Sequence, residues 1–276
     1  MDLRLLSAVR PAAVLAALLL PPATASAQSA RFEQVEPQAI EQRLRQYAGS
    51  NPVRGATVKR LFRESGCESV EEHPVLRSSA PNVSCTLPGT DEGIIVVGAH
   101  FDHVPVGDGV VDNWSGAALL PSLYESLRSI PRRHTFVFVS FTDEELGFLG
   151  SESYTAGLSG EEIGQIRAMV NLDTLGLGPT EIWVSDSDPK LVKSLIEIAS
   201  AMKLPVRGMN VDGVGDSDGR PFKKRKIPTI TLHSITNDTL GILHTGDDRF
   251  SAIKLEDYYG SYRLIAGFLA ALDAAK

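Results

Sequence analysis

Three acidic residues follow a run of apolar residues that is typical of a buried strand. The segment 135–147 reads TFVFVSFTDEELG, so Asp143, Glu144 and Glu145 come almost directly after Phe141. Like charges crowded at the end of a buried strand repel one another and lose hydration. A bound cation offsets both costs. The segment therefore indicates a site that holds positive charge.

Other apolar runs end in residues of the same chemical kinds. These residues are His100 and Asp102 after Ile94–Ala99, Asp112 in the following loop, Asp173 at the end of Ala168–Asp173, and His244 one loop after Ile227–His233. Each of them alone has an ordinary explanation as a helix cap, a turn residue or a solvated charge. Gathered in one place, carboxylates and imidazoles are typical metal ligands. The set therefore predicts a metal site, provided that the strand ends converge.

The rest of the chain alternates between helical and strand patterns. The predicted helices cover Pro37–Tyr47, Arg54–Ser65, a stretch around 117–127, turns within Leu149–Ile166, Pro189–Met202 and Lys254–Ala274. The predicted strands are Ile94–Ala99, Thr135–Phe141, Ala168–Asp173, Glu181–Val184 and Ile227–His233. This order predicts an α/β fold, with a mostly parallel mixed β-sheet flanked by helices on both faces. Ligands bind such sheets at the carboxyl ends of the strands, so the acids and histidines should meet in one crevice. The segments Gly208–Arg220 and Ser234–Leu243 are expected to be loops that wall the pocket.

The composition is that of a globular protein. The chain has 276 residues, of which 43% are hydrophobic and 22% charged, and this suits one domain over residues 28–276. The net charge of −7 argues against nucleic acid or an anionic membrane as a partner, because both bind basic surfaces. No oligomer is predicted from the sequence.

The first 27 residues have the pattern of a signal peptide. Arg4 and Arg10 precede a short apolar run, Ala12–Leu20, and the small residues Ala25-Ser26-Ala27 follow. The run is too short for a membrane-spanning helix, which needs about 20 apolar residues. We therefore expect cleavage after Ala27 and export to the periplasm or the medium.

Export changes the interpretation of the two cysteines. In an oxidising compartment Cys67 and Cys85 are expected to form a disulfide rather than two separate thiols. Closing so short a loop contributes roughly 3 kcal/mol on the chain-entropy model. The residues between them are predicted to form a hairpin or loop. Asn82, which lies there, matches a short glycan-acceptor pattern of the kind that occurs by chance.

In their order along the chain, these motifs resemble those of the co-catalytic zinc exopeptidases. That group includes the bacterial leucyl aminopeptidases and shares a superfamily with the glutaminyl cyclases. The matching segments are HFD at 100–102, VVDNWSG around Asp112, DEELGFLGS at 143–151, NLD ending at Asp173 and HT beginning at His244. The resemblance runs from about Gly93 to the final helix. It implies two zinc ions and removal of residues from peptides that have a free N-terminus.

The resemblance also implies a role for each residue. Zinc would be bound by His100 and Asp173 at one position, by Glu145 and His244 at the other, and by Asp112 at both. Glu144 would be the general base, and Asp102 would orient His100 through its second ring nitrogen.

General chemistry agrees with these roles. Two cations about 3.5–4 Å apart can hold one water and lower its pKa towards about 7, and a nearby carboxylate can then accept the proton. Neighbouring side chains of an extended segment point to opposite sides. Glu145 is therefore expected to face a metal while Glu144 faces the water.

Two positions depart from the family pattern. Leu243 stands where the leucyl aminopeptidases typically have a Tyr that suits oxyanion stabilisation. The oxyanion donor is therefore unassigned, with the second zinc as one candidate. Ser217-Asp218-Gly219 stands where the family often has Ser-Asp-His, and Asp218 is expected to contact a substrate amine. Asp248 matches a family acid and is expected to lie behind the metal ligands.

Two other functions remain open. A glutaminyl cyclase would use one zinc on the same scaffold, but such enzymes usually have Trp before the last His and an insertion after the acidic pair. A binding protein without activity would be expected to have lost a ligand or the base, and none is lost. The related carboxypeptidases carry an inserted domain for which the chain has no room between Glu145 and Asp173.

Overall fold

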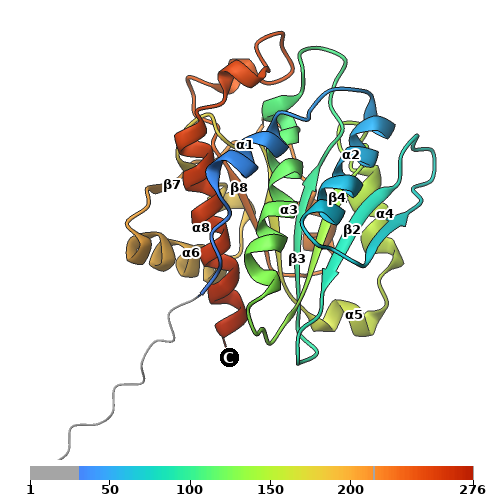
Figure 1. Ribbon diagram of the computed structural model, residues 1–276, viewed down its shortest axis with the longest axis vertical. Coiled ribbons are helices and arrows are strands. Elements are labelled where there is room, and N and C mark those ends of the chain that lie inside the picture. Colours follow the sequence, from blue (N-terminus) through green and yellow to red (C-terminus); the bar gives the residue numbers. More distant parts are fainter. Residues whose placement is uncertain (1–30, 214, 276) are drawn as a thin grey trace, which may run out of the picture.

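The computed structural model describes residues 31–213 and 215–275, and its centre is one eight-stranded sheet in the order β1-β2-β4-β3-β5-β8-β6-β7 (Figure 1). The strands are β1 (Val70–His73), β2 (Asn82–Leu87), β3 (Ile94–His100), β4 (Thr135–Phe141), β5 (Ile166–Leu172), β6 (Thr180–Ile182), β7 (Val206–Gly208) and β8 (Thr229–His233). The central strands β4, β3, β5 and β8 run parallel, while β1, β2 and β6 join by antiparallel pairing. The predicted mostly parallel mixed sheet is confirmed.

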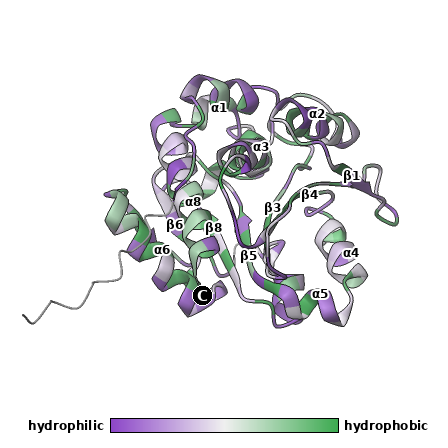
Figure 2. Cartoon of the chain, turned by 60° about the horizontal axis from the view of Figure 1, so that its bottom comes forward, coloured by the Kyte–Doolittle hydropathy of each residue, from purple (hydrophilic) through white to green (hydrophobic). Residues whose placement is uncertain are grey.

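Helices cover both faces of the sheet (Figure 2). One face carries α1 (Pro37–Leu44), α2 (Asn51–Glu64), α3 (Ser115–Arg128), α6 (Pro189–Met202) and α8 (Leu255–Ala274), and the other carries α4 (Leu149–Gly157), α5 (Gly160–Gln165) and α7 (Gly219–Lys224). Side chains of the central strands alternate between these two layers. In β3, for example, Ile95 and Val97 pack under α3, whereas Val96 packs with Phe222 of α7. Burial on both faces explains why these strands read as continuous apolar runs.

The structure differs from the sequence prediction at several element boundaries. Helix α2 begins at Asn51 rather than Arg54, since Pro52 is compatible with a first helical turn. Strand β6 ends at Ile182, and the next residues form a 3-10 turn, Val184–Asp186. The predicted loop after Gly208 leads into α7, a short helix that the sequence pattern did not reveal. Strands β1 and β2 form the hairpin expected between the cysteines.

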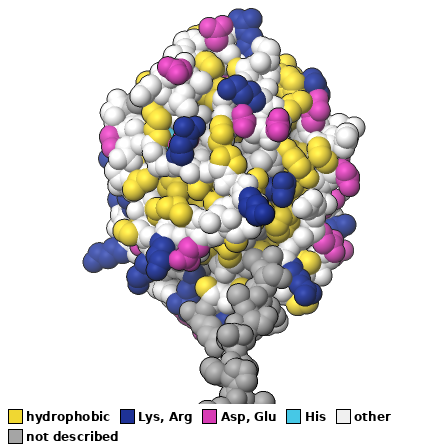
Figure 3. Space-filling view, turned by 90° about the vertical axis from the view of Figure 1, so that its left-hand side faces the viewer, with side chains coloured by type: hydrophobic (Ala, Val, Ile, Leu, Met, Phe, Trp, Pro, Cys, Tyr) yellow, Lys and Arg dark blue, Asp and Glu magenta, His cyan; other side chains and the backbone are white. Residues whose placement is uncertain are grey.

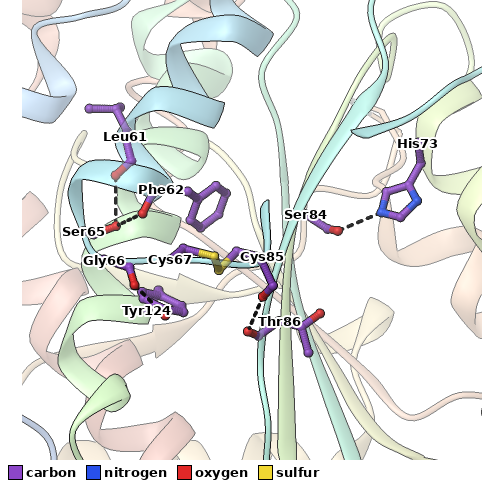
Figure 4. The surroundings of a disulfide bond; sticks show 11 residues. Leu61, Phe62, Ser65, Gly66, Cys67, His73, Ser84, Cys85, Thr86 and Tyr124 are labelled. Carbon is purple, nitrogen blue, oxygen red and sulfur yellow. Dashed lines mark hydrogen bonds between the residues drawn. A yellow bond between two sulfur atoms is a disulfide. The ribbon is translucent and has the colours of Figure 1, made fainter. Parts of the chain in front are cut away.

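A disulfide joins the end of α2 to the sheet (Figure 4). Cys67 follows α2, and Cys85 lies in the middle of β2, with 6.4 Å between their Cα atoms. Both cysteines are buried beside Phe62 in the main apolar core. The bond therefore holds α2 against the edge of the sheet on which the hairpin lies.

The exposed face of α6 carries apolar side chains interspersed with charged ones (Figure 3). A shallow groove there is lined by Val184, Pro189, Val192 and Ile196, and Ile196 is 49% exposed. In the described part of the chain no helix has both the length and the apolar character that crossing a membrane requires. The predicted signal peptide lies outside the described residues.

Candidate metal centre and pocket

The ends of the parallel strands bring six predicted metal and base residues into two clusters. Ligand atoms of His100, Glu144 and Asp173 all lie within 4.8 Å of one another, and so do those of Asp112, Glu145 and His244. These residues come from the ends of β3, β4 and β5 and from two loops. The convergence that the strand-end rule predicted is therefore present.

Asp112 lies between the two clusters. Its Oδ1 is 3.4 Å from Nε2 of His100, and its Oδ2 is 3.1 Å from Nε2 of His244. Asp173 Oδ1 lies 3.5 Å from the same nitrogen of His100, and Glu145 Oε1 lies 3.2 Å from that of His244. One carboxylate thus reaches both imidazoles with separate oxygens, which is the arrangement of a bridging ligand.

Buried polar side chains hold the backbone around Asp112. The two oxygens of Asp248 accept hydrogen bonds from the backbone N–H groups of Val111, at 2.7 Å, and Asp112, at 3.2 Å. Asn113 donates to the Leu172 carbonyl and accepts from the Thr174 N–H, so it ties the Asp112 segment to the end of β5. Asp248 is buried, and it lies behind the bridging position as the sequence led us to expect.

The acidic pair after β4 lies in a turn, and the prediction of an extended segment is wrong. The N–H groups of Gly147 and Phe148 both donate to the Glu144 carbonyl, at 2.9 and 2.8 Å. Because the chain turns here, Glu144 and Glu145 both line the same pocket instead of pointing to opposite sides of a strand. Glu144 belongs to the cluster of His100, and Glu145 belongs to the cluster of His244. Glu144 approaches His100 with 4.0 Å between Oε2 and Nε2, whereas Glu145 approaches His244.

Asp102 has a contact that the sequence did not suggest. Its oxygens accept hydrogen bonds from the backbone N–H groups of Glu144, at 3.0 Å, and Glu145, at 3.1 Å. Its Oδ1 also lies 3.4 Å from Nδ1 of His100, which is on the expected side but longer than an ordinary hydrogen bond. Asp102 therefore supports the acidic turn as well as adjoining the histidine.

Four residues at the site have left-handed backbone conformations. These are Asp143 before the acidic pair (φ 52°), Phe148 after it (63°), Thr174 after Asp173 (59°) and His244 itself (57°). The left-handed region costs energy for residues other than glycine, most of all for a β-branched one such as Thr174. Surrounding packing and hydrogen bonds must hold these conformations, and they aim the neighbouring side chains into the pocket.

In the metal-free chain, the pKa values of His100 and Glu144 depart strongly from their usual values. Burial opposes a charge on His100, but the surrounding carboxylates of Glu144, Asp102, Asp112 and Asp173 together raise its pKa well above the usual value. Burial raises the pKa of Glu144 well above the usual range. These shifts show how strongly the site favours a positive charge at its centre.

The pKa values of Glu145 and His244, in the second cluster, are also raised. Burial raises the pKa of Glu145 to about 7. The hydrogen bond from His244 to Asp112 and the nearby charge of Glu145 raise the pKa of His244 to about 9. Imidazole and carboxylate donors in these two clusters fit zinc, which binds nitrogen and oxygen ligands of this kind.

One protein-family model covers the segments that carry these residues. The family model described as "Peptidase family M28" matches residues 82–269, which is more than half of the chain. The chain belongs to peptidase family M28.

Individual relatives of this M28 chain are aminopeptidases by name. Aminopeptidase YwaD of Bacillus subtilis is 30% identical over 171 residues, which are 59% of this chain and 37% of that protein. The chain spans little more than a third of the length of the first curated relatives that it matches.

Solved structures share the fold. BSAP, a zinc aminopeptidase from Bacillus subtilis, aligns with a TM-score of 0.63 and 24% identity over 69% of this chain and 49% of that chain. A glutaminyl cyclase from an Acidobacteriales bacterium aligns with a TM-score of 0.72 and 20% identity over 92% of this chain and 99% of that chain. At these identities the likeness concerns the fold alone.

A pocket of about 390 Å³ opens beside the two clusters of the M28 chain. Its acidic end is formed by the candidate ligands and Glu144. Another part of its wall is an apolar cluster that includes Trp183, Val211, Ile235, Leu240 and Leu243. Leu243, which directly precedes His244, therefore contributes an apolar wall and no hydroxyl group.

His233 lines the pocket and is held by contacts within the fold, whereas Asp218 is buried and is not among the lining residues. Both ring nitrogens of His233 have partners, since Nδ1 accepts from the Ile235 N–H and Nε2 lies 3.0 Å from the Met209 carbonyl. Asp218 is 1% exposed, and neither of its oxygens has a hydrogen-bond partner among the described residues. Burial raises its pKa to about 7. Asp216, two residues earlier, lines the pocket instead.

Asn82 is a structural residue of the site that sequence reasoning missed. It lies at the start of β2 and is buried. Its side-chain nitrogen donates to the Gly150 carbonyl at 2.9 Å, and its oxygen accepts from the Thr142 N–H at 3.1 Å. Asn82 thus spans the two ends of the loop that carries the acidic pair. The only sequence signal was a polar residue at the start of a strand.

Proposed function

We propose that this M28 chain is a zinc-dependent aminopeptidase. The observation that carries the proposal is the position of Asp112, whose two oxygens reach the histidines of two separate ligand clusters beside one pocket. Family membership and the names of the relatives support peptidase chemistry. The description of BSAP as a zinc enzyme supports the metal.

Zinc ions would be held by His100 and Asp173 in one cluster, by Glu145 and His244 in the other, and by Asp112 in both. When bound, zinc would supply a Lewis acid that polarises a carbonyl and lowers the pKa of water. Asp248 and Asp102 keep the backbone segments that carry these ligands in register. Such supporting groups set the orientation of metal ligands.

Glu144 acts as the general base. Its carboxylate lies in the pocket, with 4.0 Å between Oε2 and Nε2 of His100, and it would accept a proton from water attacking a peptide carbonyl. In the metal-free chain, burial raises its pKa well above the usual range. The same carboxyl group then returns the proton to the leaving amine.

The pocket favours peptides with a free N-terminus and an apolar first residue. At the acidic end a bound zinc or a carboxylate would anchor the free amino group, and the wall formed by Trp183, Ile235 and Leu243 suits an apolar side chain. A blocked N-terminus removes the amino group that this end binds. The substrate class is therefore a peptide with a large apolar residue at its free N-terminus.

Hydrolysis of leucyl-anilide by the zinc-loaded protein tests the proposal. The Glu144→Gln variant should lower kcat by about 10²–10⁴-fold with unchanged metal content. Glu161→Gln, an exposed carboxylate of α5, serves as the matched control. N-acetylated leucyl-anilide should not be cleaved. Turnover by Glu144→Gln at the rate of the parent would contradict the assignment of the base.

The glutaminyl cyclase reaction is the second candidate. The fold match to a cyclase that covers nearly its whole length favours it. The presence of two ligand clusters and the apolar Leu243 before His244 favour the peptidase. Incubation with glutaminyl peptides distinguishes them, because a cyclase releases ammonia and leaves the peptide bond intact. One bound zinc together with that product would favour the cyclase.

We also propose that the chain is exported and cleaved after Ala27. The signal pattern of residues 1–27 and the Cys67–Cys85 disulfide both support this location. Cleavage would leave the remaining residues as one domain. Sequencing of the N-terminus of the secreted protein should begin at Gln28.

A further inference from the structure

A buried arginine reaches the two segments that carry metal ligands. Arg54 lies on α2 and is 1% exposed. Its Nη1 donates to the carbonyls of Phe101, at 3.1 Å, and Gly109, at 3.0 Å, and its Nη2 donates to the carbonyl of Asp108. Three backbone carbonyls from two stretches of chain therefore meet at one guanidinium group.

These carbonyls flank candidate ligands. Phe101 directly follows His100, and Asp108 and Gly109 begin the turn that places Asp112. No strand pairing joins the Asp108–Gly109 segment to the end of β3. Arg54 provides a direct link between them, so it sets the spacing between the ligand on the strand and the bridging ligand.

The guanidinium group also balances buried negative charge. Asp102 and Asp248, which support the acidic turn and the Asp112 backbone, act on Arg54 electrostatically together with Asp108. Burial lowers the pKa of Arg54 to about 10, and these acids oppose that shift, so the group stays charged at neutral pH. It lies 5.6 Å above the ring of Trp114, which fixes its plane.

Helix α2 is firmly attached to the rest of the fold. Val58, Leu61 and Phe62 are buried in the core, and the disulfide holds the end of the helix. At its start, Asn51 donates to the Asp143 carboxylate at 3.3 Å. The family match begins at residue 82, so α2 lies outside it.

We propose that Arg54 is a positioning residue that aligns the His100 and Asp112 segments and thereby sets metal affinity. The inference rests on the proposed zinc site. A planar fork with several N–H groups can bind three carbonyls at once, whereas the single ammonium of lysine cannot hold the same set. The three hydrogen bonds to carbonyls and the positive charge beside buried acids therefore distinguish Arg54 from a residue that only contributes packing.

Zinc affinity of the metal-free full chain, measured by competition with a chromophoric chelator, tests the proposal. Arg54→Met and Arg54→Lys should each bind zinc about 10–100-fold more weakly than the parent. The visible absorption of the cobalt-loaded variants should also differ from that of the parent, because it reports ligand geometry. Arg63→Met, an exposed arginine on the same helix, should match the parent in both measurements.

Circular dichroism identifies the variants that fold. If Arg54→Met does not fold, Arg54→Lys, which keeps the charge, decides the question. Folded variants that bind zinc within about threefold of the parent, with the same cobalt spectrum, would overturn the positioning role while leaving the zinc site intact. A parent that binds no zinc would instead refute the proposed function, which separates the two failures.

Discussion

The Asp102 carboxylate accepts a hydrogen bond from the Glu144 backbone N–H at 3.0 Å, and its second oxygen accepts one from the next residue. A residue placed two positions after a candidate histidine ligand thus holds the turn that carries the candidate base. The acidic turn and the end of β3 are coupled through one buried carboxylate.

Replacing Asp102 by Asn should disturb this turn. The amide offers one acceptor and one donor group, so one of the two backbone N–H groups loses its partner. Leaving a buried donor unpaired costs about 1–3 kcal/mol of unfolding free energy. We expect activity to fall about 10–100-fold, since groups that support metal ligands have effects of this size. Denaturant unfolding and anilide hydrolysis measure the two effects.

Asp238→Asn is the control for this substitution, because Asp238 is an exposed acid that is not among the pocket-lining residues. It should behave as the parent in both measurements. Equal activity of Asp102→Asn and the parent would show that the turn does not depend on the carboxylate.

Zinc affinity should rise with pH between about 7 and 9. In the metal-free chain the pKa of His244 is about 9, so its imidazole carries a proton that zinc must displace. Glu145, with a pKa of about 7, adds a second proton at the lower end of the range. Each displaced proton increases affinity up to about tenfold per pH unit until its pKa is passed. Chelator competition at several pH values measures the slope, and a flat profile would contradict the shifted pKa values.

Asn82→Ala should loosen the loop that carries Glu144 and Glu145. It removes the partners of the Thr142 N–H and the Gly150 carbonyl, and each unpaired buried group costs about 1–3 kcal/mol. We therefore expect lower stability together with lower kcat. Asn237→Ala, at an exposed asparagine, is the control. If kcat stayed unchanged while stability fell, Asn82 would stabilise the fold without positioning the loop that carries Glu144 and Glu145.

Removing the disulfide should destabilise the chain. Cys67 and Cys85 are 18 residues apart, and closing a loop of this length contributes roughly 3 kcal/mol to the unfolding free energy on the chain-entropy model. The double Cys67→Ser, Cys85→Ser variant should unfold at lower denaturant concentration than the parent. Reduction of the parent by dithiothreitol should reproduce the shift. An unchanged midpoint in both experiments would mean that packing alone holds α2 to the hairpin.

The cluster residues at the ends of β3, β4 and β5 could be predicted because their signals are local. An apolar run identifies a buried strand, and the polar residue directly after it must lie at the carboxyl edge of the sheet. His100, Glu145 and Asp173 follow this rule, and it needs no knowledge of what packs against each strand. Element boundaries were less predictable, as α2 and α7 show, because tertiary contacts decide where a short helix starts.

The supporting contacts could not be predicted, since they join positions far apart in the chain. Asn82 binds a loop 60 residues or more away, and Arg54 reaches carbonyls around 50 residues later. No periodicity records such pairs, because a hydrogen bond across the fold depends on how helices and strands are placed in space.

The sequence by itself determined the α/β class, the presence of the central apolar strands and the chemical nature of the candidate ligands, because each depends on neighbouring residues. Only the tertiary structure decided that Glu144 and Glu145 lie in one turn beside one pocket and that Asp102 accepts hydrogen bonds from this turn. It also decided that Trp183 and Leu243 contribute to the apolar wall of the pocket. Those features arise from packing between distant segments, where distance and direction are set by the whole core and not by any single stretch of chain.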